Sequence, residues 1–555
     1  MTLSRRDAFK LGGLSLLGAA ALTTPLGRGA QAKSASRLSS SNFPKRYGVE
    51  ITKTPALQPT MVNGVAHYDL TMSRNPYAQV LTANLKTPVF GYDGVFPGPR
   101  VELHRGTPAV MRLRNHLPAV GPFGSAAKTS THLHGSASLP EYDGYANDTT
   151  AVGQYKDYHY PNFQPARTLW YHDHGVHWTA QQAYGGLAAM YLLHDKEEQE
   201  LLPKGDFDIP LMINDAIFGA DGQLLYEDNS HSGLWGDVIL VNGRPWPVMK
   251  VQRRTYRFRI LNCSIARSFN WRLSNGMPLQ VVATDGGLMP KGVAVTSMRH
   301  AGAERYEVVI DFSKVPTSTT RIELLNGSNK NNVDYDYTNK VMAFDLLPGP
   351  VTKTRASYDN PDVREPDPTW NRSYDGFPLV DSEVMSLPTS GAYKRRHFRL
   401  KRSDTTQQFM IDDTTWEDVV DSEYSEVLAD PDLGDVEIWE LENSSGGWFH
   451  PVHIHLVDFR IIKRVGGAGR VYPHEQGPKD VVYVGEGETV HLLVKFNPPG
   501  GDPDFKGGRY MVHCHNLPHE DHDMMGQFSV GECDLDGWDP HHPITAAPPV
   551  KDDAY

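Results

Sequence analysis

The 555-residue sequence has few cysteines, no long hydrophobic run and no concentrated positive charge. Three cysteines are too few for a disulfide scaffold: Cys263, Cys514 and Cys533. No apolar run approaches the roughly 18 to 20 residues that cross a bilayer, so we expect no stable membrane insertion. A formal net charge of −12 without a long Lys/Arg cluster argues against nucleic acid or an anionic membrane as the main partner.

Long amphipathic helical patterns are also scarce. Short apolar or alternating segments bounded by turn residues recur instead, for example at 109–113, 187–193, 306–312 and 490–496. The 50 glycines and 40 prolines favour a turn-rich β protein. We therefore predict an all-β chain, most simply several Greek-key β-sandwiches in series.

The first 32 residues resemble a twin-arginine signal peptide. Arg5 and Arg6 precede an apolar stretch over 11–22, and Ala30 to Ala32 forms a small-x-small cleavage pattern. The alternative is a buried first helix that happens to carry two arginines. The signal predicts the twin-arginine export machinery as a partner, and a destination in a bacterial periplasm or outside the cell.

Composition also predicts a linker and a tail. Residues 348–395 are rich in Pro, Asp, Ser and Thr with little periodicity, and a shorter break lies near 195–205. The acidic, Pro-rich residues 534–555 are predicted to form a surface tail. The sequence leaves open whether Cys263 and Cys533 pair or remain separate buried thiols.

Four His-x-His pairs stand out among the 24 histidines, whereas composition alone would give about one. Residues i and i+2 of a β-strand project to the same face, so each pair can present two imidazoles toward one point. Buried imidazoles need polar partners, and transition metals favour them as ligands. The sequence therefore predicts a metal cluster formed by eight histidines: His132, His134, His172, His174, His453, His455, His513 and His515.

Cys514 lies between the two histidines of the last pair and points to the opposite face of a strand. His519 and Met524 follow it closely, and His450 lies off the face of the His453/His455 pair. Two histidines, one cysteine and a distant methionine form the ligand set of a blue-copper electron-transfer site. We therefore predict a one-electron copper centre joined to the histidine cluster through the peptide bonds that flank Cys514.

These four motifs resemble those of the multicopper oxidase family, and the similarity covers about residues 48–530. They read Thr131-His132-Leu133-His134-Gly135, Trp170-Tyr171-His172-Asp173-His174, His450-Pro451-Val452-His453-Ile454-His455, and His513-Cys514-His515 with His519 and Met524. The resemblance implies three cupredoxin domains, at 48–200, 205–347 and 396–533.

The resemblance also implies four copper ions. Type 1 copper would be bound by His450, Cys514, His519 and Met524. Type 2 copper would be bound by His132 and His453. The coupled type 3 pair would be bound by His134, His172, His174, His455, His513 and His515.

Within the family, the sequence is most similar to bilirubin oxidases, followed by spore-coat laccase and phenoxazinone synthase. The shared stretches include 142–144, 235–238, 303–308 and 519–525. The likeness implies one-electron oxidation of phenols, aromatic amines or tetrapyrroles, coupled to four-electron reduction of O2 to water.

Further roles are expected for residues beside the ligands. Asp143 and Glu520 would relay protons to the cluster, the alternative for each being a hydrogen-bonded strut. Trp448 would lie beside the type 1 site, or be an ordinary packed indole. Asp173, between two ligand histidines, would anchor a loop or orient a ligand.

Two other functions remain open. A metal-ion oxidase acting on Mn2+ or Cu+ is the first, although the Met-rich segment common in cuprous oxidases is missing from this sequence. The second is a copper-free envelope scaffold, which the intact ligand residues disfavour. Histidines outside the pairs, such as His67, His159 and His177, are expected at the surface or in the core. His522 lies in the ligand loop without matching a ligand position.

Overall fold

The computed structural model describes residues 35–82, 84–348, 372–503, 505–531, 533 and 548–555. Strands dominate this part of the chain and pair into six sheets, so the predicted all-β class is confirmed. The predicted signal peptide (1–32) and residues 349–371 of the predicted linker lie outside the described residues. Within the described ranges, no helix is long and apolar enough to cross a membrane.

Two sheets are formed mainly by the first third of the chain. One contains β1 (Thr60–Val62), β2 (Val65–Asn75), β3 (Val89–Tyr92), β5 (Ala109–Asn115), β7 (Gln154–Tyr160) and β31 (Val550–Lys551). The other contains β4 (Val101–His104), β6 (Thr131–His134), β8 (Arg167–Asp173) and β9 (Ala188–His194). Helices α2 (Thr179–Gly185) and α3 (Lys196–Leu201) flank β9 in the sequence.

The middle of the chain forms the next two sheets. The larger contains β10 (Asp208–Ala216), β11 (Val238–Val241), β12 (Arg244–Pro245), β14 (Thr255–Asn262), β16 (Leu279–Thr284), β17 (Gly287–Val295) and β19 (Arg305–Asp311). Its partner contains β13 (Val248–Val251), β15 (Phe269–Leu273), β18 (Met298–His300), β20 (Arg321–Asn326) and β21 (Lys340–Leu346).

The last two sheets come from the C-terminal third. One contains β22 (Lys394–Arg402), β23 (Phe409–Ile411), β24 (Val436–Asn443), β26 (Phe459–Val465) and β28 (Thr489–Lys495). The other contains β25 (His450–Ile454), β27 (Val481–Val484), β29 (Gly507–Cys514) and β30 (Met525–Gly531). Short helices α4 (Glu383–Ser386), α5 (Trp416–Asp421) and α6 (Leu517–Glu520) lie outside the sheets.

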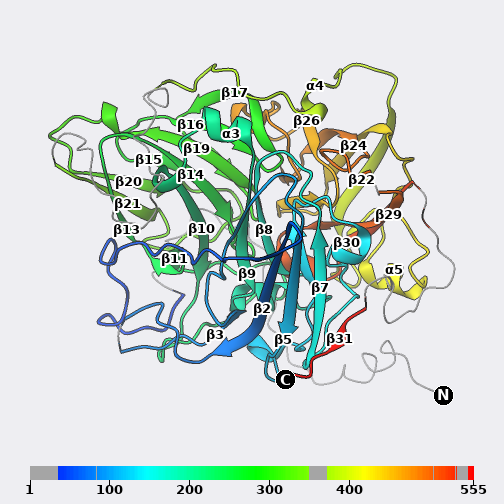
Figure 1. The fold of residues 1–555 in the computed structure, drawn as a ribbon, viewed down its shortest axis with the longest axis horizontal. Coiled ribbons are helices and arrows are strands. Elements are labelled where there is room, and N and C mark those ends of the chain that lie inside the picture. The colour runs from blue at the N-terminus through cyan, green and yellow to red at the C-terminus, as the bar shows by residue number, and fades with distance from the viewer. Residues whose placement is uncertain (1–34, 83, 349–371, 504, 532, 534–547) are drawn as a thin grey trace.

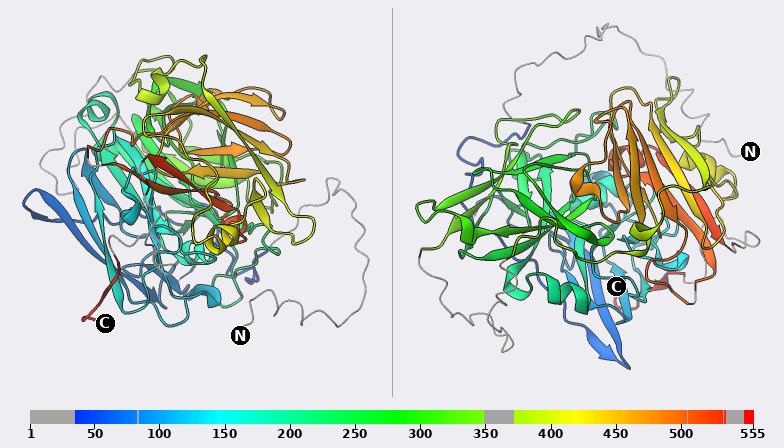
Figure 2. Two further views of the ribbon diagram at one scale, coloured as in Figure 1. Left: turned by 90° about the vertical axis from the view of Figure 1, so that its right-hand side faces the viewer. Right: turned by 90° about the horizontal axis from the view of Figure 1, so that it is seen from above.

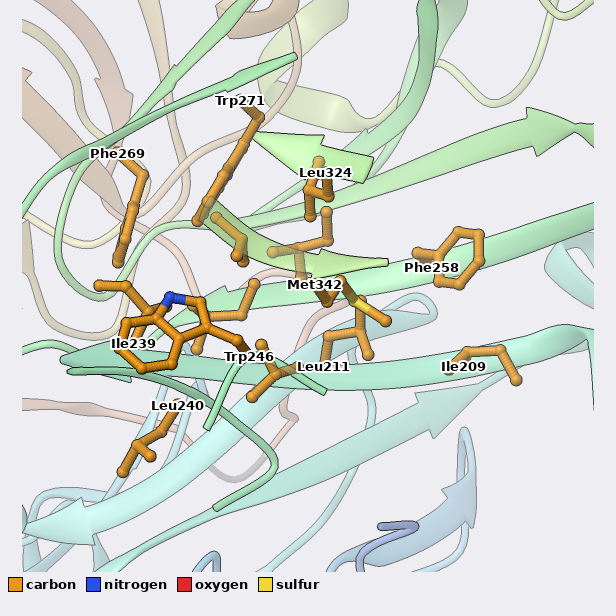
Figure 3. Close-up of a cluster of buried hydrophobic side chains, with 14 of the residues drawn as sticks. Ile209, Leu211, Ile239, Leu240, Trp246, Phe258, Phe269, Trp271, Leu324 and Met342 are labelled. Atoms are coloured by element: carbon orange, nitrogen blue, oxygen red, sulfur yellow. The ribbon is translucent and has the colours of Figure 1, made fainter. Parts of the chain in front are cut away.

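Apolar side chains fill the space between paired sheets. Figure 3 shows this for the middle sandwich, where Leu211 and Phe258 of one sheet face Trp271, Leu324 and Met342 of the other. These side chains are almost fully buried. Burying an aliphatic or aromatic side chain contributes roughly 1.5 to 3 kcal/mol, so this core stabilises the pairing of the two sheets.

The three sandwiches pack around a common centre, as the blue-to-cyan, green and yellow-to-red regions show from several sides (Figures 1 and 2). The end of the chain is not a free tail, because β31 pairs with β7 of the first sandwich. Asp552 is held there by Arg114 and His116, each at 2.7 Å. The last eight residues of the predicted tail are therefore attached to the first sandwich, and most of them are exposed.

The described part of the predicted linker also has a defined partner. Residues 376–380 run along β17, with Leu379 N donating to Pro290 O at 2.9 Å and Gly292 N donating to Phe377 O at 3.0 Å. The division into 48–200, 205–347 and 396–533 stays a prediction.

Candidate metal centre

Strand register places the paired histidines opposite one another. His132 of β6 faces His172 of β8, and His453 of β25 faces His513 of β29. The first two strands come from the first sandwich and the last two from the third. The two pairs of strands meet, because Nε2 of His132 lies 3.4 Å from Nε2 of His453.

All eight histidines of the pairs converge on one buried centre and are at most 1% exposed. Their ring nitrogens form overlapping groups whose atoms lie within 4.8 Å of one another. Two separate groups contain three histidines each: His134, His172 and His515, and His174, His455 and His513. A third contains His132, His453 and His455.

Backbone carbonyls orient several of these rings from behind. Nδ1 of His132 donates to Asp143 O at 2.5 Å, and Nδ1 of His453 donates to Asp480 O at 2.8 Å. Nδ1 of His172 donates to Asp173 O at 2.8 Å. A neutral imidazole that donates from Nδ1 keeps Nε2 as an acceptor, which is the tautomer that binds a metal ion.

The chemistry of this donor set fits transition-metal ions. Within the described chain, Nε2 of His172 and both ring nitrogens of His515 are buried without a hydrogen bond partner. Burial lowers the pKa of His174 to about 3, so the ring is neutral at neutral pH. Buried acceptors without donors are unfavourable, and a metal ion would satisfy them.

A second group of ligands lies beside the first. Nδ1 of His450 is 3.4 Å from Sγ of Cys514, and Nδ1 of His519 is 3.7 Å from the same sulfur. The two Nδ1 atoms are 3.2 Å apart. On their outer sides, Nε2 of His450 lies 2.8 Å from Ser445 Oγ, and Nε2 of His519 donates to Ser232 O at 3.2 Å.

Backbone hydrogen bonds bring Met524 to this second group. Cys514 N donates to Met524 O, and Met524 N donates to His519 O, each at 3.0 Å. Burial raises the pKa of the Cys514 thiol, so a thiolate here needs a compensating cation such as a metal ion. The residues on both sides of Cys514, His513 and His515, belong to the histidine centre, so one tripeptide joins the two groups.

The two predicted relay carboxylates both touch the histidine centre. Oδ2 of Asp143 lies 2.7 Å from Nδ1 of His455, and Oε2 of Glu520 lies 2.8 Å from Nδ1 of His513. Burial raises the pKa of Asp143, and His132 offsets part of that rise. Burial also acts to raise the pKa of Glu520, but His513 and His174 outweigh it and leave the pKa below its usual value.

Three family models described as multicopper oxidase match this chain, at residues 76–198, 195–338 and 394–534. Together they cover most of its length.

The chain belongs to the multicopper oxidase family. It is therefore an oxidoreductase that binds copper. Among curated proteins it is 38% identical to bilirubin oxidase of Albifimbria verrucaria over 507 residues, which is 87% of this chain and 81% of that protein. It is 32% identical to a laccase of Bacillus subtilis (strain 168), over 80% of this chain and 90% of that protein.

Solved structures agree with this assignment. The multicopper oxidase McoA of Aquifex aeolicus superposes with a TM-score of 0.69 at 28% identity, covering 87% of this chain and all of that one. A laccase of Pediococcus acidilactici gives a TM-score of 0.71 at 26% identity, with 90% of this chain and all of that chain covered. The predicted series of cupredoxin-like sandwiches and the predicted resemblance to bilirubin oxidase are confirmed.

In this multicopper oxidase, Asp480 lies behind the histidines, and no sequence pattern predicts its place there. Oδ1 of Asp480 lies 3.3 Å from Nε2 of His134, and its carboxylate forms a bidentate ion pair with Arg305 at 2.6 and 2.5 Å. Arg305 comes from β19 of the middle sandwich, which contributes no histidine to the centre. The His-x-His spacing does not predict the ion pair of Asp480 and Arg305, because the two residues are 175 positions apart in the chain.

Aromatic rings cover the second group of this oxidase. Phe409 stacks on His519 with ring centroids 3.9 Å apart, and Trp448 meets His519 edge-on at 6.5 Å. Trp448 is partly exposed whereas Phe409 is buried. The resemblance predicts the place of Trp448, whereas no sequence pattern marks Phe409, which lies 110 residues before His519 on β23.

Three other residues of the oxidase have defined positions. Asp173 accepts from Ser130 N at 3.0 Å and from Gly175 N at 2.9 Å, so it anchors the loop beside the histidines. Cys263 and Cys533 are both partly exposed and are not joined by a disulfide in the described structure, which decides the open alternative.

Proposed function

We propose that this multicopper oxidase binds four copper ions. The type 1 ion would be held by His450, Cys514, His519 and Met524. The type 2 ion would be held by His132 and His453. The type 3 pair would be held by His134, His172, His174, His455, His513 and His515. The division of six histidines into two separate groups of three supports this assignment.

The proposed reaction is oxidation of phenols, aromatic amines or tetrapyrroles at the expense of O2. When bound, the copper ions accept single electrons from the donor and reduce O2 to two molecules of water. The observation that carries the proposal is the tripeptide His513-Cys514-His515, which joins a thiolate site to the histidine centre. The relatives named bilirubin oxidase and laccase support this class of donor.

Protons reach the centre through carboxylates in this proposal. Asp143 and Glu520 are buried, and each has an oxygen within 2.8 Å of Nδ1 of a cluster histidine. The raised pKa of Asp143 favours its protonated form, and the lowered pKa of Glu520 favours its carboxylate form, so the two groups would differ in protonation state.

The donor would approach the partly exposed edge of Trp448. Its indole lies 5.6 Å from Phe409, and the Phe409 ring in turn stacks on His519. These rings form a short contact path from solvent to a proposed type 1 ligand.

The deciding experiment is copper loading followed by spectroscopy and oxygen uptake. We expect about four coppers per chain, an intense visible thiolate-to-copper band, and O2 uptake that is faster with bilirubin or a phenol than with manganous ion. Faster uptake with manganous ion would replace the proposed donor by a metal ion. Absence of the band after copper loading would overturn the oxidase assignment for this site.

We also propose that the chain is exported by the twin-arginine machinery to the periplasm or the exterior. Arg5 and Arg6 before an apolar stretch support this route. Replacing both by lysine should leave the enzyme in the cytoplasmic fraction. Secretion of the double variant at the normal level would contradict the proposal.

A further inference from the structure

A loop of the second sandwich closes over the outer edge of His519. The loop spans residues 228–233, between β10 and β11, and we call it the 228–233 loop. The carbonyl of Ser232 accepts a hydrogen bond from Nε2 of His519 at 3.2 Å. The His519 side chain is 0% exposed, although residues 229–231 at the tip of the loop are exposed. A surface loop of one sandwich therefore covers a buried predicted ligand of another.

Other groups cover the remaining sides of the same imidazole. The side-chain amide nitrogen of Asn516 lies 3.1 Å from Nε2 of His519. Phe409 stacks on the ring with centroids 3.9 Å apart, and Nδ1 faces Sγ of Cys514 at 3.7 Å. With the 228–233 loop in place, the ring is closed to direct contact with a donor molecule.

The backbone of the 228–233 loop has an unfavourable conformation. Asn229, Ser230 and His231 all adopt positive φ, at 52°, 54° and 64°. Left-handed residues other than glycine are uncommon, and they persist where surrounding contacts fix them. Two hydrogen bonds do so here, from Gly233 N to Asp228 O at 2.9 Å and from Asn229 Nδ2 to Gly233 O at 2.7 Å. These bonds fix the loop in its covering shape.

A side chain of the loop also fastens it to the third sandwich. The rings of His231 and His522 stack with centroids 4.3 Å apart and an interplanar angle of 19°. Oδ2 of Asp228 lies 3.2 Å from Nδ1 of His231 and holds that ring in place. His522 follows His519 by three residues, so the loop contacts two positions of one short segment.

Closure of the His519 edge leaves Trp448 as the approach for a donor. Trp448 is partly exposed, and its indole lies 5.6 Å from Phe409. An electron that enters at Trp448 crosses two ring contacts before it reaches His519, and electron transfer becomes slower as this distance grows. A donor with several rings can offset the distance by stacking more area on the indole, because buried apolar surface contributes roughly 25 cal/mol per Å2. A single-ring phenol has less area to bury there.

We propose that the 228–233 loop is a specificity-determining cap, which keeps single-ring phenols from the edge of His519 and so favours multi-ring aromatic donors such as tetrapyrroles. Ser232 supplies the carbonyl that covers Nε2, and His231 fastens the cap to His522. The effect on donor choice rests on the proposed function, whereas the covering of His519 does not.

A shortened loop tests the effect on donor choice. Replacing residues 229–232 by two glycines removes the Ser232 carbonyl, and Gly233 N can still bond to Asp228 O as in a four-residue β-turn. In copper-loaded enzyme we expect kcat/KM to rise about tenfold for a single-ring methoxyphenol and to change less than about twofold for bilirubin. Ser230→Gly keeps the loop length and suits the positive φ, so it should match the wild type. Unchanged methoxyphenol kinetics in the shortened enzyme, or an equal rise for both donors, overturns the proposed specificity.

Hydroxyl-radical labelling measures the cover itself, without turnover. Mass spectrometry should find little oxidation of His519 in the wild type and in Ser230→Gly, and severalfold more in the shortened enzyme. Equal oxidation of His519 in all three proteins overturns the cap.

A second variant decides the matter if the shortened enzyme does not fold. His231→Ala removes the stack on His522, so both the labelling of His519 and the methoxyphenol kcat/KM should rise. Values equal to those of the wild type in both measurements overturn the proposal. A missing visible copper band in the wild type would count against the oxidase proposal, and the labelling would still decide whether the loop covers His519.

Discussion

The histidines of the metal centre are held from behind by groups that are not themselves predicted ligands. Asp143 is the clearest case, because its carboxylate contacts Nδ1 of His455 and its backbone carbonyl accepts from His132. Partners of this kind set the orientation of metal-binding rings.

Replacing Asp143 separates positioning from proton transfer. Asp143→Ala removes the contact to His455, so we expect copper affinity or O2 uptake to fall by about 10- to 100-fold. Asp143→Asn keeps an oxygen acceptor but cannot carry a proton, so it should retain copper and still lose rate. Copper counts and oxygen uptake measure both effects. Asp157→Ala, a partly exposed carboxylate paired with Arg112, is the control and should change neither. Full activity of Asp143→Asn would show that Asp143 positions His455 and does not transfer protons.

A buried glutamate that is not among the predicted ligands contributes to the acid sensitivity of the protein. Burial would raise the pKa of Glu475, but Arg464 and Arg299 lower it to about 2. The unfolded value is about 4.3, so the ion pair stabilises the fold above that pH, and this contribution is lost as the pH falls toward 2. Its size is about 3 kcal/mol.

Glu475→Gln should therefore lower the melting temperature most near pH 6, and the difference from wild type should shrink as the pH approaches 2. Thermal unfolding at several pH values gives this difference. Glu486→Gln removes an exposed partner of Lys330 and should leave the melting temperature nearly unchanged at every pH. A pH-independent deficit in Glu475→Gln would contradict the assigned pKa.

At the scale of secondary-structure elements, the turn after Asp143 supports strand β6. Gly144 has φ of +76°, and a Cβ built on it would lie 2.4 Å from Thr131 O and 2.6 Å from the Cα of His132. A side chain at this position must therefore displace the strand that carries His132.

Gly144→Ala should reduce copper content and lower stability by several kcal/mol, since overpacking adds about 1 to 3 kcal/mol to the backbone strain. Gly106→Ala is the matched control, because Gly106 has φ of +80° and nothing within 4 Å of its Cβ position. It should lose only about 1 to 2 kcal/mol and keep its copper. Unfolding and copper analysis compare the two variants. Equal losses would show that strain alone, rather than the contact with β6, is responsible.

Elements with local signals could be predicted from the sequence, whereas long-range partners could not. The two-residue period of a strand was enough to place His132 with His134 and His513 with His515. The same reasoning separated Cys514 from its neighbours. Phe409, Asp480 and Ser232 reach the metal centre only through tertiary folding, so no local pattern marks them. The return of β31 to the first sandwich also lacks a signal, because Val550 and Lys551 form a two-residue strand.

At the scale of the whole molecule, the middle sandwich contributes an arginine rather than a histidine to the centre. Arg305 is fully buried and pairs with Asp480 of the third sandwich, while its Nε donates to Thr168 O of the first at 2.9 Å. This one side chain therefore links all three sandwiches.

Removing one partner of this pair should be more harmful than removing both. Asp480→Leu removes the nearer carboxylate from buried Arg305 and leaves only Asp285 at 3.7 Å, so it should destabilise the protein by about 3 to 5 kcal/mol. The double variant Asp480→Leu/Arg305→Leu should recover much of that loss, because a buried ion pair can often be replaced by apolar side chains. Denaturant unfolding of copper-loaded protein compares the variants. A double variant no more stable than Asp480→Leu would show that the two residues do not act as a pair.

The two halves of the histidine centre lie more than 300 positions apart in the chain, as the contact between His132 and His453 shows. No partial chain emerging from the ribosome can therefore assemble the cluster until the third sandwich has been made and has docked against the first. The complete histidine cluster therefore forms only when the last strands are present and in register, whereas His450, Cys514, His519 and Met524 all lie within the third sandwich.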